Sequence, residues 1–309
     1  MIKDKNKTMT CGVINELASS PKDFLLSCTS DYAAAVENAA DIICSDENKK
    51  IIMLAGPSSS GKTTTAHLLA SAVEGRGAKC YPISLDDFYH SHSSNRYPLD
   101  ETGKPDYECV ESLDLDLLHR CLNELLSCGK SRLPLFDFKS GERSSEVREI
   151  ELNNNDIIII EGLHALNPVI TETLDAQALF KIYVSVSSRI YEEDGSVLFS
   201  KRDLRFIRRM VRDYRTRNSS PDSTFAIWNS VMRGEDKYLF PFEPLADLKL
   251  DSFHACEPCV LADEGMRLLK NVGGEYAAKA ALLYEKLALF DKIDYSILPA
   301  DSLLREFTG

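Results

Sequence analysis

Short runs of apolar residues recur along the chain, separated by longer segments whose apolar positions repeat at helical spacing. In the run at 156–161, four isoleucines stand between two acidic residues, which is typical of a strand covered on both faces. Strands are predicted at 51–55, 80–85, 156–161, 179–186 and 245–250, with a hairpin strand at 146–152. Helices are predicted at 31–44, 63–74, 113–126, 201–216, 277–289 and 302–307. This alternation predicts an α/β fold with a mostly parallel sheet flanked by helices.

The flanking segments differ from this alternating region. Residues 1–28 are mixed in character and predict no element, and Ser30 is the expected N-cap of the helix at 31–44. The polar segment at 89–107, with two prolines and a glycine, predicts a loop. We therefore expect an N-terminal helical segment at 1–48, an α/β domain at 49–260 and a C-terminal helical segment at 261–309.

Charge and cysteine content narrow the class of protein. The 309 residues carry a formal net charge of −12, which disfavours binding to nucleic acid and to anionic lipid. Nine cysteines are scattered through apolar surroundings, as expected for reduced thiols rather than a secreted disulfide framework. No apolar run has the roughly 20 residues of a membrane helix, and residues 1–12 do not resemble a signal peptide. We expect a cytoplasmic protein.

The clearest chemical motif is GPSSSGKT at 56–63, which fits the pattern G-x-x-x-x-G-K-[ST]. Such a loop points successive backbone N–H groups at phosphate oxygens, and the following helix adds the positive end of its dipole. Lys62 would reach the β- and γ-phosphates, and the Thr63 hydroxyl would ligate Mg²⁺. Because a predicted strand precedes the motif and a predicted helix follows it, we expect a P-loop NTPase fold. The expected nucleotide-binding residues are Gly56, Ser58, Ser59, Ser60, Gly61, Lys62, Thr63 and Thr64.

Acidic residues end two of the predicted strands. The carboxyl ends of parallel strands face the ligand crevice, so Asp86 or Asp87 should lie beside the terminal phosphate. A kinase needs a carboxylate there to accept the proton of the acceptor hydroxyl, and we favour Asp86, which could also contact the metal. A turn aspartate without catalytic function is the alternative. Glu161, after the four isoleucines, is the expected second Mg²⁺ ligand, unless it merely ends its strand.

The helix predicted at 201–216 carries most of the local positive charge. Arg205, Arg208, Arg209 and Arg212 share one face and have no acids matched to them in the pattern. Such a row is favourable against a polyphosphate, which predicts an arginine-rich lid that closes over ATP. A solvated charged face and a nucleic-acid patch are the alternatives, and the net charge argues against the second.

Together, in this order, the motifs resemble the uridine kinase and phosphoribulokinase family of P-loop kinases. The stretches that carry the resemblance are GPSSSGKTTTA, SLDDFY, GKPDYE, LPLFDFKSGER, IIIIEGLHALN, RRMVRDYRTR and KYLFPFEPLAD, with LPADSLLREF shared by a bacterial nucleoside kinase branch. The resemblance implies that Lys62 and Thr63 hold phosphate and Mg²⁺, that Asp86 is the catalytic base and that Glu161 is a metal ligand. It also implies contacts to the acceptor or the phosphates from Tyr89, Asp106, Phe136, Arg143, Arg209, Arg212 and Arg217, with Asp106 on ribose hydroxyls.

The chain departs from the resemblance at the base-reading segment. Uridine–cytidine kinases have a histidine where this chain has Gly141, and Phe136 lacks the phenolic hydroxyl usual at its position. Fewer polar groups should weaken discrimination between bases. We expect an ATP- or GTP-dependent, Mg²⁺-requiring kinase of nucleoside salvage that phosphorylates a nucleoside 5′-hydroxyl, as a monomer or a homo-oligomer. The alternatives are a kinase of another small alcohol, such as a sugar, a sugar phosphate or a pantothenate-like compound, and a nucleotide-binding regulator or RNA-associated ATPase.

Overall fold

Alternate residues of the central strands face opposite layers of the molecule. The computed structural model describes residues 9–99, 101 and 103–309, and its sheet has the strand order β2-β5-β1-β6-β9 with parallel pairings throughout. The strands are β1 (Ile51–Ala55), β2 (Cys80–Ser84), β5 (Ile157–Glu161), β6 (Leu179–Ser185) and β9 (Leu248–Asp251). Each coincides with a predicted strand, which confirms the α/β fold class.

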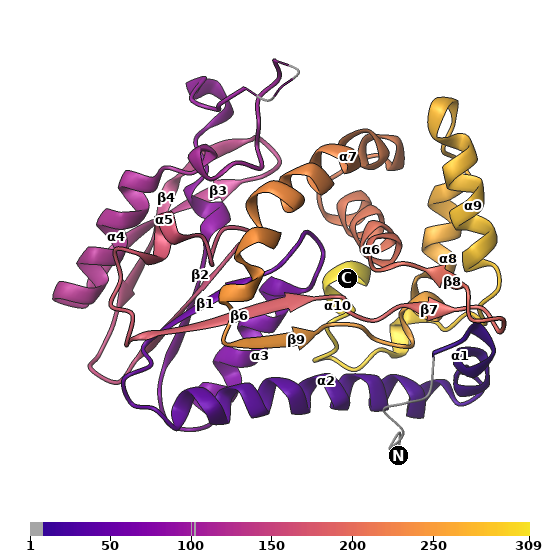
Figure 1. Cartoon of the computed structure of the whole chain (residues 1–309), viewed down its shortest axis with the longest axis horizontal. Coiled ribbons are helices and arrows are strands. Elements are labelled where there is room, and N and C mark those ends of the chain that lie inside the picture. Colours follow the sequence, from indigo (N-terminus) through magenta and orange to yellow (C-terminus); the bar gives the residue numbers. More distant parts are fainter. Residues whose placement is uncertain (1–8, 100, 102) are drawn as a thin grey trace.

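The two faces of the sheet are covered by different elements. Ile52 and Leu54 of β1 join a large apolar core, whereas Ile51 and Met53 join a second core on the other face. The first core includes α1 (Cys11–Ala18), α2 (Pro21–Cys44), α3 (Lys62–Glu74), α6 (Lys201–Thr216), α7 (Pro221–Tyr238), α8 (Glu257–Leu269), α9 (Ala277–Leu287) and α10 (Arg305–Thr308). The second includes α4 (Leu115–Cys128), α5 (Pro168–Thr171) and the hairpin of β3 (Lys130–Asp137) and β4 (Glu142–Glu151). In Figure 1, α4 and this hairpin lie at one end of the molecule, and α8 and α9 lie at the other.

Short elements complete the chain. A second hairpin joins β7 (Ile190–Tyr191) to β8 (Val197–Phe199). The 3₁₀ helices are Leu85–Phe88, His92–Ser94, Val110–Ser112, Phe240–Leu245, Gly274–Tyr276 and Tyr295–Ile297. None of the helices in the described ranges is long and apolar enough to cross a membrane. The segment at 1–12, which was predicted not to be a signal peptide, falls mostly on residues 1–8, and the predicted loop includes 100 and 102. Residues 1–8, 100 and 102 lie outside the described ones.

The first long helix begins earlier than its sequence pattern predicts. The predicted N-cap at Ser30 is wrong, because α2 begins ten residues earlier at Pro21, with Ser20 as its N-cap residue. Proline is well suited to the first turn, where its missing N–H has no intrahelical partner. Phe24, Leu25 and Cys28 are buried in this early part, so tertiary packing extends a helix whose local pattern is weak. The helices α7 and α8 were not predicted either.

Candidate functional site

The turn between β1 and α3 has the backbone shape of a phosphate-binding loop. A Cβ on Gly56 would lie 2.1 Å from the Val184 carbonyl oxygen, so only glycine fits there. Ser59 has a φ of 57° and Gly61 a φ of 85°, both in the left-handed region, and α3 begins directly afterwards at Lys62. Within the described part of the chain, the buried hydroxyls of Ser59 and Ser60 have no hydrogen-bond partner. These residues therefore fit a bound phosphate chain with Mg²⁺.

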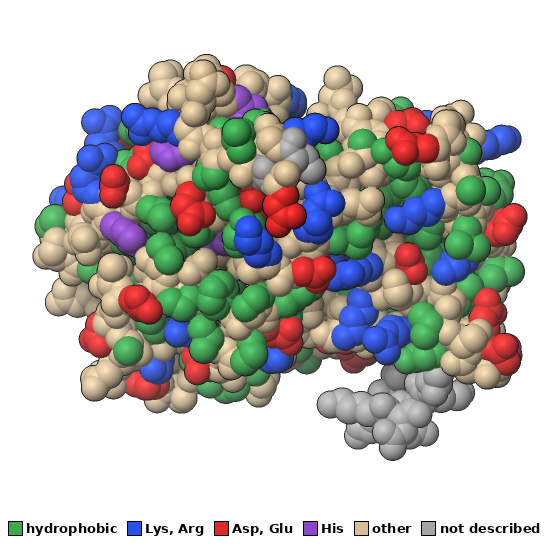
Figure 2. Space-filling model, turned by 45° about the horizontal axis from the view of Figure 1, so that its top comes forward, with side chains coloured by type: hydrophobic (Ala, Val, Ile, Leu, Met, Phe, Trp, Pro, Cys, Tyr) green, Lys and Arg blue, Asp and Glu red, His purple; other side chains and the backbone are tan. Residues whose placement is uncertain are grey.

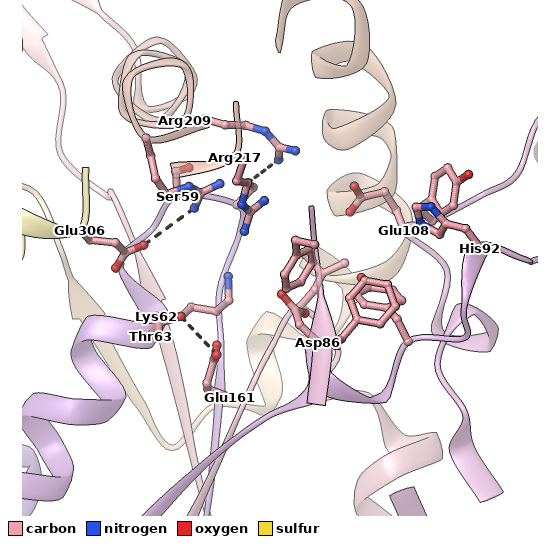
Figure 3. Close-up of a pocket in the computed structure, with 18 of the residues that line it drawn as sticks. Ser59, Lys62, Thr63, Asp86, His92, Glu108, Glu161, Arg209, Arg217 and Glu306 are labelled. Carbon is pink, nitrogen blue, oxygen red and sulfur yellow. Dashed lines mark hydrogen bonds and ion pairs between the residues drawn. The ribbon is translucent and has the colours of Figure 1, made fainter. Parts of the chain in front are cut away.

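A cavity of about 290 Å³ opens in front of this turn (Figure 3). It is lined by twelve of the predicted site residues: Ser58, Ser59, Gly61, Lys62, Thr63, Asp86, Tyr89, Phe136, Glu161, Arg209, Arg212 and Arg217. The side chains come from the P-loop, from the ends of β2 and β5, from β3 and from α6 with its C-cap. The fold thus brings together residues that lie more than 150 positions apart in the chain.

Five predicted residues do not line this cavity. Gly56 and Ser60 belong to the loop beneath it, and the Thr64 hydroxyl donates to Glu306 Oε2 at 2.6 Å. Asp106 lines a neighbouring hollow, where its carboxylate accepts from the Tyr238 hydroxyl at 3.0 Å and from the backbone N–H of Glu108.

Arg143, the fifth, has a supporting position behind the cavity wall. It pairs with Asp114 at 3.2 Å and donates to the Tyr89 carbonyl at 3.0 Å. These contacts fix the backbone of Tyr89, which does line the cavity.

The two adjacent aspartates after β2 have different environments. Asp86 lines the cavity opposite Lys62, as Figure 3 shows. Asp87 accepts a hydrogen bond from the backbone N–H of Phe136 at 3.1 Å, and burial raises the pKa of its carboxyl. Asp86 therefore has the position of a base, and Asp87 holds the strand that presents Phe136.

Glu161 stands below the P-loop at the end of β5. It is 5% exposed and accepts hydrogen bonds from the Thr63 hydroxyl at 3.2 Å and from the Ser84 hydroxyl at 2.8 Å. Burial, reinforced by the charge of Asp86, raises the pKa of Glu161 to about 7. In the described ranges, no group of three or more His, Cys, Asp or Glu side chains could hold a metal ion. Thr63 and Glu161 fit a Mg²⁺ ion that takes its remaining ligands from phosphate and water.

The arginine-rich helix α6 is a core helix, with Leu204, Ile207 and Met210 all buried. The prediction that its arginines lack matching acids is wrong. Arg205 pairs with Glu235 at 2.6 Å and Arg208 pairs with Glu257, and all four side chains are buried. The acids come from α7 and α8, elements that the local pattern did not predict.

Arg209 and Arg212 are the members of the row that reach the cavity. Arg209 donates to the Ser58 hydroxyl at 2.6 Å, and Arg212 pairs with Asp213 at 2.8 Å. Burial would raise the pKa of Asp213, but Arg212, Arg209 and Arg217 outweigh it and lower the pKa. One carboxylate thus orients three guanidinium groups beside the P-loop.

Aromatic rings form the wall farthest from the P-loop, and four of them were not predicted. The six rings are those of Tyr89, His92, Tyr97, Tyr107, Phe136 and Phe138. The His92 centroid lies 5.1 Å from that of Tyr107 and 6.1 Å from that of Phe136. A Cβ at Gly141 would lie only 2.2 Å from His92 Nδ1. The glycine that departs from the family pattern therefore makes room for an imidazole from another loop.

Two acidic residues of the cavity were also missed. Glu108 points into the cavity (Figure 3), and burial raises the pKa of its carboxyl to about 7. It stands two positions after Asp106, so the same stretch of sequence could have suggested it. Glu306 lies 242 residues from its partner Thr64, and no local pattern points to it.

Comparison with known proteins gives consistent matches. The model of the phosphoribulokinase/uridine kinase family matches residues 51–256. A uridine kinase of Lactobacillus helveticus (strain DPC 4571) is 31% identical over 204 residues, covering 65% of this chain and 86% of the relative. A uridine kinase of Staphylococcus aureus (strain JH9) is 30% identical over 200 residues, covering 64% of this chain and 85% of the relative. The solved structure of a possible uridine kinase from Bacillus stearothermophilus is similar with a TM-score of 0.48 and 21% identity, over 70% of this chain and 97% of that one.

Proposed function

The chain belongs to the phosphoribulokinase/uridine kinase family, and from this premise we propose that it transfers the γ-phosphate of ATP to the 5′-hydroxyl of a nucleoside. Family membership makes the chain a kinase with an alcohol acceptor. The proposal adds that this alcohol is a nucleoside. The observation that carries it is the single cavity in which the P-loop, Asp86 and an aromatic wall face one another. A planar base could stack on that wall, and its sugar would then point toward Asp86.

The charged and hydroxyl side chains nearest the P-loop have distinct roles in this proposal. Lys62, Arg209 and Arg212 bind and orient the phosphates and offset their charge as the phosphoryl group moves. Asp86 accepts the proton of the acceptor hydroxyl and aims its oxygen at the phosphorus. Thr63 and Glu161 would hold Mg²⁺, which supplies additional charge neutralisation when bound. Glu108, rather than Asp106, has the position to accept hydrogen bonds from sugar hydroxyls.

A second candidate is a kinase of a smaller alcohol. The cavity of about 290 Å³ lies at the small end of the range for ligand sites, and it must also receive the terminal phosphate. The RNA-associated alternative has less support. The arginines of α6 are paired with acids, and Figure 2 shows basic and acidic side chains intermixed on one face of the molecule.

ADP release by the purified protein with Mg·ATP tests the proposal. The acceptors would be the common ribonucleosides and deoxyribonucleosides, free sugars, sugar phosphates and pantothenate, with Lys62→Ala as the inactive control. We expect turnover with at least one nucleoside and a product phosphorylated at the 5′ position. Turnover of a sugar or another alcohol, with none of any nucleoside, would show that the acceptor assignment is wrong.

A further inference from the structure

The C-terminal residues Ser302–Gly309 are packed against the phosphate-binding loop. The family match ends at residue 256, so this segment lies outside it. Leu303, Leu304 and Phe307 are each at most 1% exposed, and Figure 1 shows the C-terminus in the middle of the molecule beside α6. The buried side chains of this segment are therefore part of the surroundings of the site.

Two contacts tie the segment to the start of α3. A Cβ at Gly61 would lie 2.6 Å from Leu303 Cδ1, so the leucine packs directly on the glycine of the P-loop. The Thr64 hydroxyl donates to Glu306 Oε2 at 2.6 Å. Gly61 and Thr64 flank Lys62 and Thr63, which line the cavity and would contact the phosphates under the proposed function.

Glu306 also faces the arginines of the opposite wall. Its side chain lines the cavity, and its Oε1 lies 3.9 Å from Arg212 Nη1 (Figure 3). The carboxylate thus connects the first turn of α3 with α6, the two elements that would hold a triphosphate from opposite sides. A carboxylate beside bound phosphates is repelled by them unless cations and donors hold it, and Arg212 and Thr64 do so here.

We infer that Glu306 is a positioning residue of the phosphate-donor site, through which the C-terminal segment prepares the P-loop and Arg212 for the nucleotide. The inference rests on the proposed function. The hydrogen bond fixes the first turn of α3, and the carboxylate adds a 3.9 Å ion pair to Arg212, which Asp213 holds at 2.8 Å. Both contacts order protein groups in advance, so ATP binding loses less free energy to ordering them. Acceptor binding would involve the aromatic wall, whereas the polar contacts of Glu306 in the described part of the chain go to Thr64 and Arg212.

Direct binding of Mg·ATP in the absence of acceptor, measured by calorimetry, tests the inference. We expect Glu306→Ala to raise the Kd for Mg·ATP about tenfold, as loss of a charge-assisted hydrogen bond would. Glu306→Gln can still accept from Thr64 and should regain most of the affinity. Glu285→Ala, which removes an exposed acid on α9, is the matched control and should bind as the unaltered protein does. Under turnover, the KM for ATP should rise while the KM for the acceptor stays within twofold.

Thr64→Val supplies an independent arm that does not depend on the stability of Glu306 variants. It removes the other partner of the hydrogen bond, so Thr64→Val and Glu306→Ala should be non-additive when combined. Unchanged or tighter Mg·ATP binding by Glu306→Ala, with the unaltered protein binding normally, would overturn the inference and leave the proposed function standing. Absence of Mg·ATP binding by the unaltered protein would overturn both.

Discussion

Neighbouring residues of the same type have different tasks around this cavity. Asp86 faces the P-loop, whereas Asp87 is bonded to the backbone of Phe136. Arg208 is buried against Glu257, whereas Arg209 reaches the Ser58 hydroxyl. A change of one position along a turn or helix redirects the side chain, so function at this scale depends on direction as much as on residue type.

Asp86→Asn tests the assignment of the base. The amide cannot accept the hydroxyl proton, so we expect kcat to fall by about 10²–10⁴-fold with little change in melting temperature. Asp87→Ala should retain kcat within about tenfold and mainly raise the KM for the acceptor, because the backbone N–H of Phe136 loses its acceptor. Initial rates and thermal melts of both variants measure this. If the two variants exchange these effects, Asp87 is the base.

Glu161 predicts a pH-dependent stability of the ligand-free protein. Its pKa of about 7 lies above the ordinary value near 4.3, so the folded protein binds this proton more tightly than the unfolded chain. The stabilisation from the protonated Glu161 is therefore fully present below about pH 4, and it is lost as the pH rises to about 7. Glu161→Gln should be more stable than the unaltered protein at pH 8 by about 1–3 kcal/mol, and the difference should shrink toward pH 5.

Urea unfolding of both proteins across this pH range, without nucleotide or Mg²⁺, gives the measurement. The relevant quantity is the difference in the free energy of unfolding between the two proteins. Glu108 titrates in the same pH range in both proteins, so its effect cancels in that difference. A difference that is the same at pH 5 and at pH 8 would contradict the raised pKa. The variant should also lose most kinase activity, since an amide is a poorer ligand for Mg²⁺ than a carboxylate.

At the scale of elements, buried ion pairs join α6 to its neighbours and to the P-loop. Glu235 of α7 pairs with Arg205 and also accepts from the backbone N–H of Ser58 at 2.8 Å. The same two helices carry a second pair, Arg202 with Asp236, which is about half exposed. The chain thus offers a buried and an exposed arginine–carboxylate pair between the same two helices.

Arg205→Met and Arg202→Met make a matched comparison. Arg205→Met leaves the Glu235 charge buried without its cation, so the free energy of unfolding should fall by about 3–5 kcal/mol. Arg202→Met removes a pair screened by solvent and should cost less than about 1 kcal/mol. Urea denaturation of both variants measures the two losses. Equal decreases in the free energy of unfolding would mean that burial does not determine how much these ion pairs stabilise the protein.

At the scale of the whole molecule, the helices α1 and α2 and the C-terminal segment belong to one core. Tyr32 of α2 hydrogen-bonds Thr65 of α3 at 2.6 Å, and α10 packs against α6. Apolar residues of α2, the central strands and the C-terminal segment join in a single cluster. The predicted division at 48 and 260 therefore separates segments that bury the same apolar surface.

Excision of residues 49–260 tests this cooperativity. Without the flanking helices, the fragment exposes the sheet face that α2 covers and the surface of α6 that contacts Phe307. We expect it to be insoluble or to lack a cooperative melt, whereas the full chain unfolds in one transition. Circular dichroism melts of both proteins measure this. A fragment that melts cooperatively near the temperature of the full chain would show that 49–260 folds independently.

The sequence by itself determined the five strands, the P-loop and twelve of the residues around the cavity. The strands β1 and β5 are buried along their whole length and require continuous apolar runs, and a phosphate loop requires glycines at set positions, so both leave local signals. The early start of α2, the helices α7 and α8 and the partners of Arg205 and Arg208 were decided by tertiary packing. So were Glu108, His92 and Glu306 as cavity residues, because side chains from distant loops meet only when the sheet and its helices fix their positions.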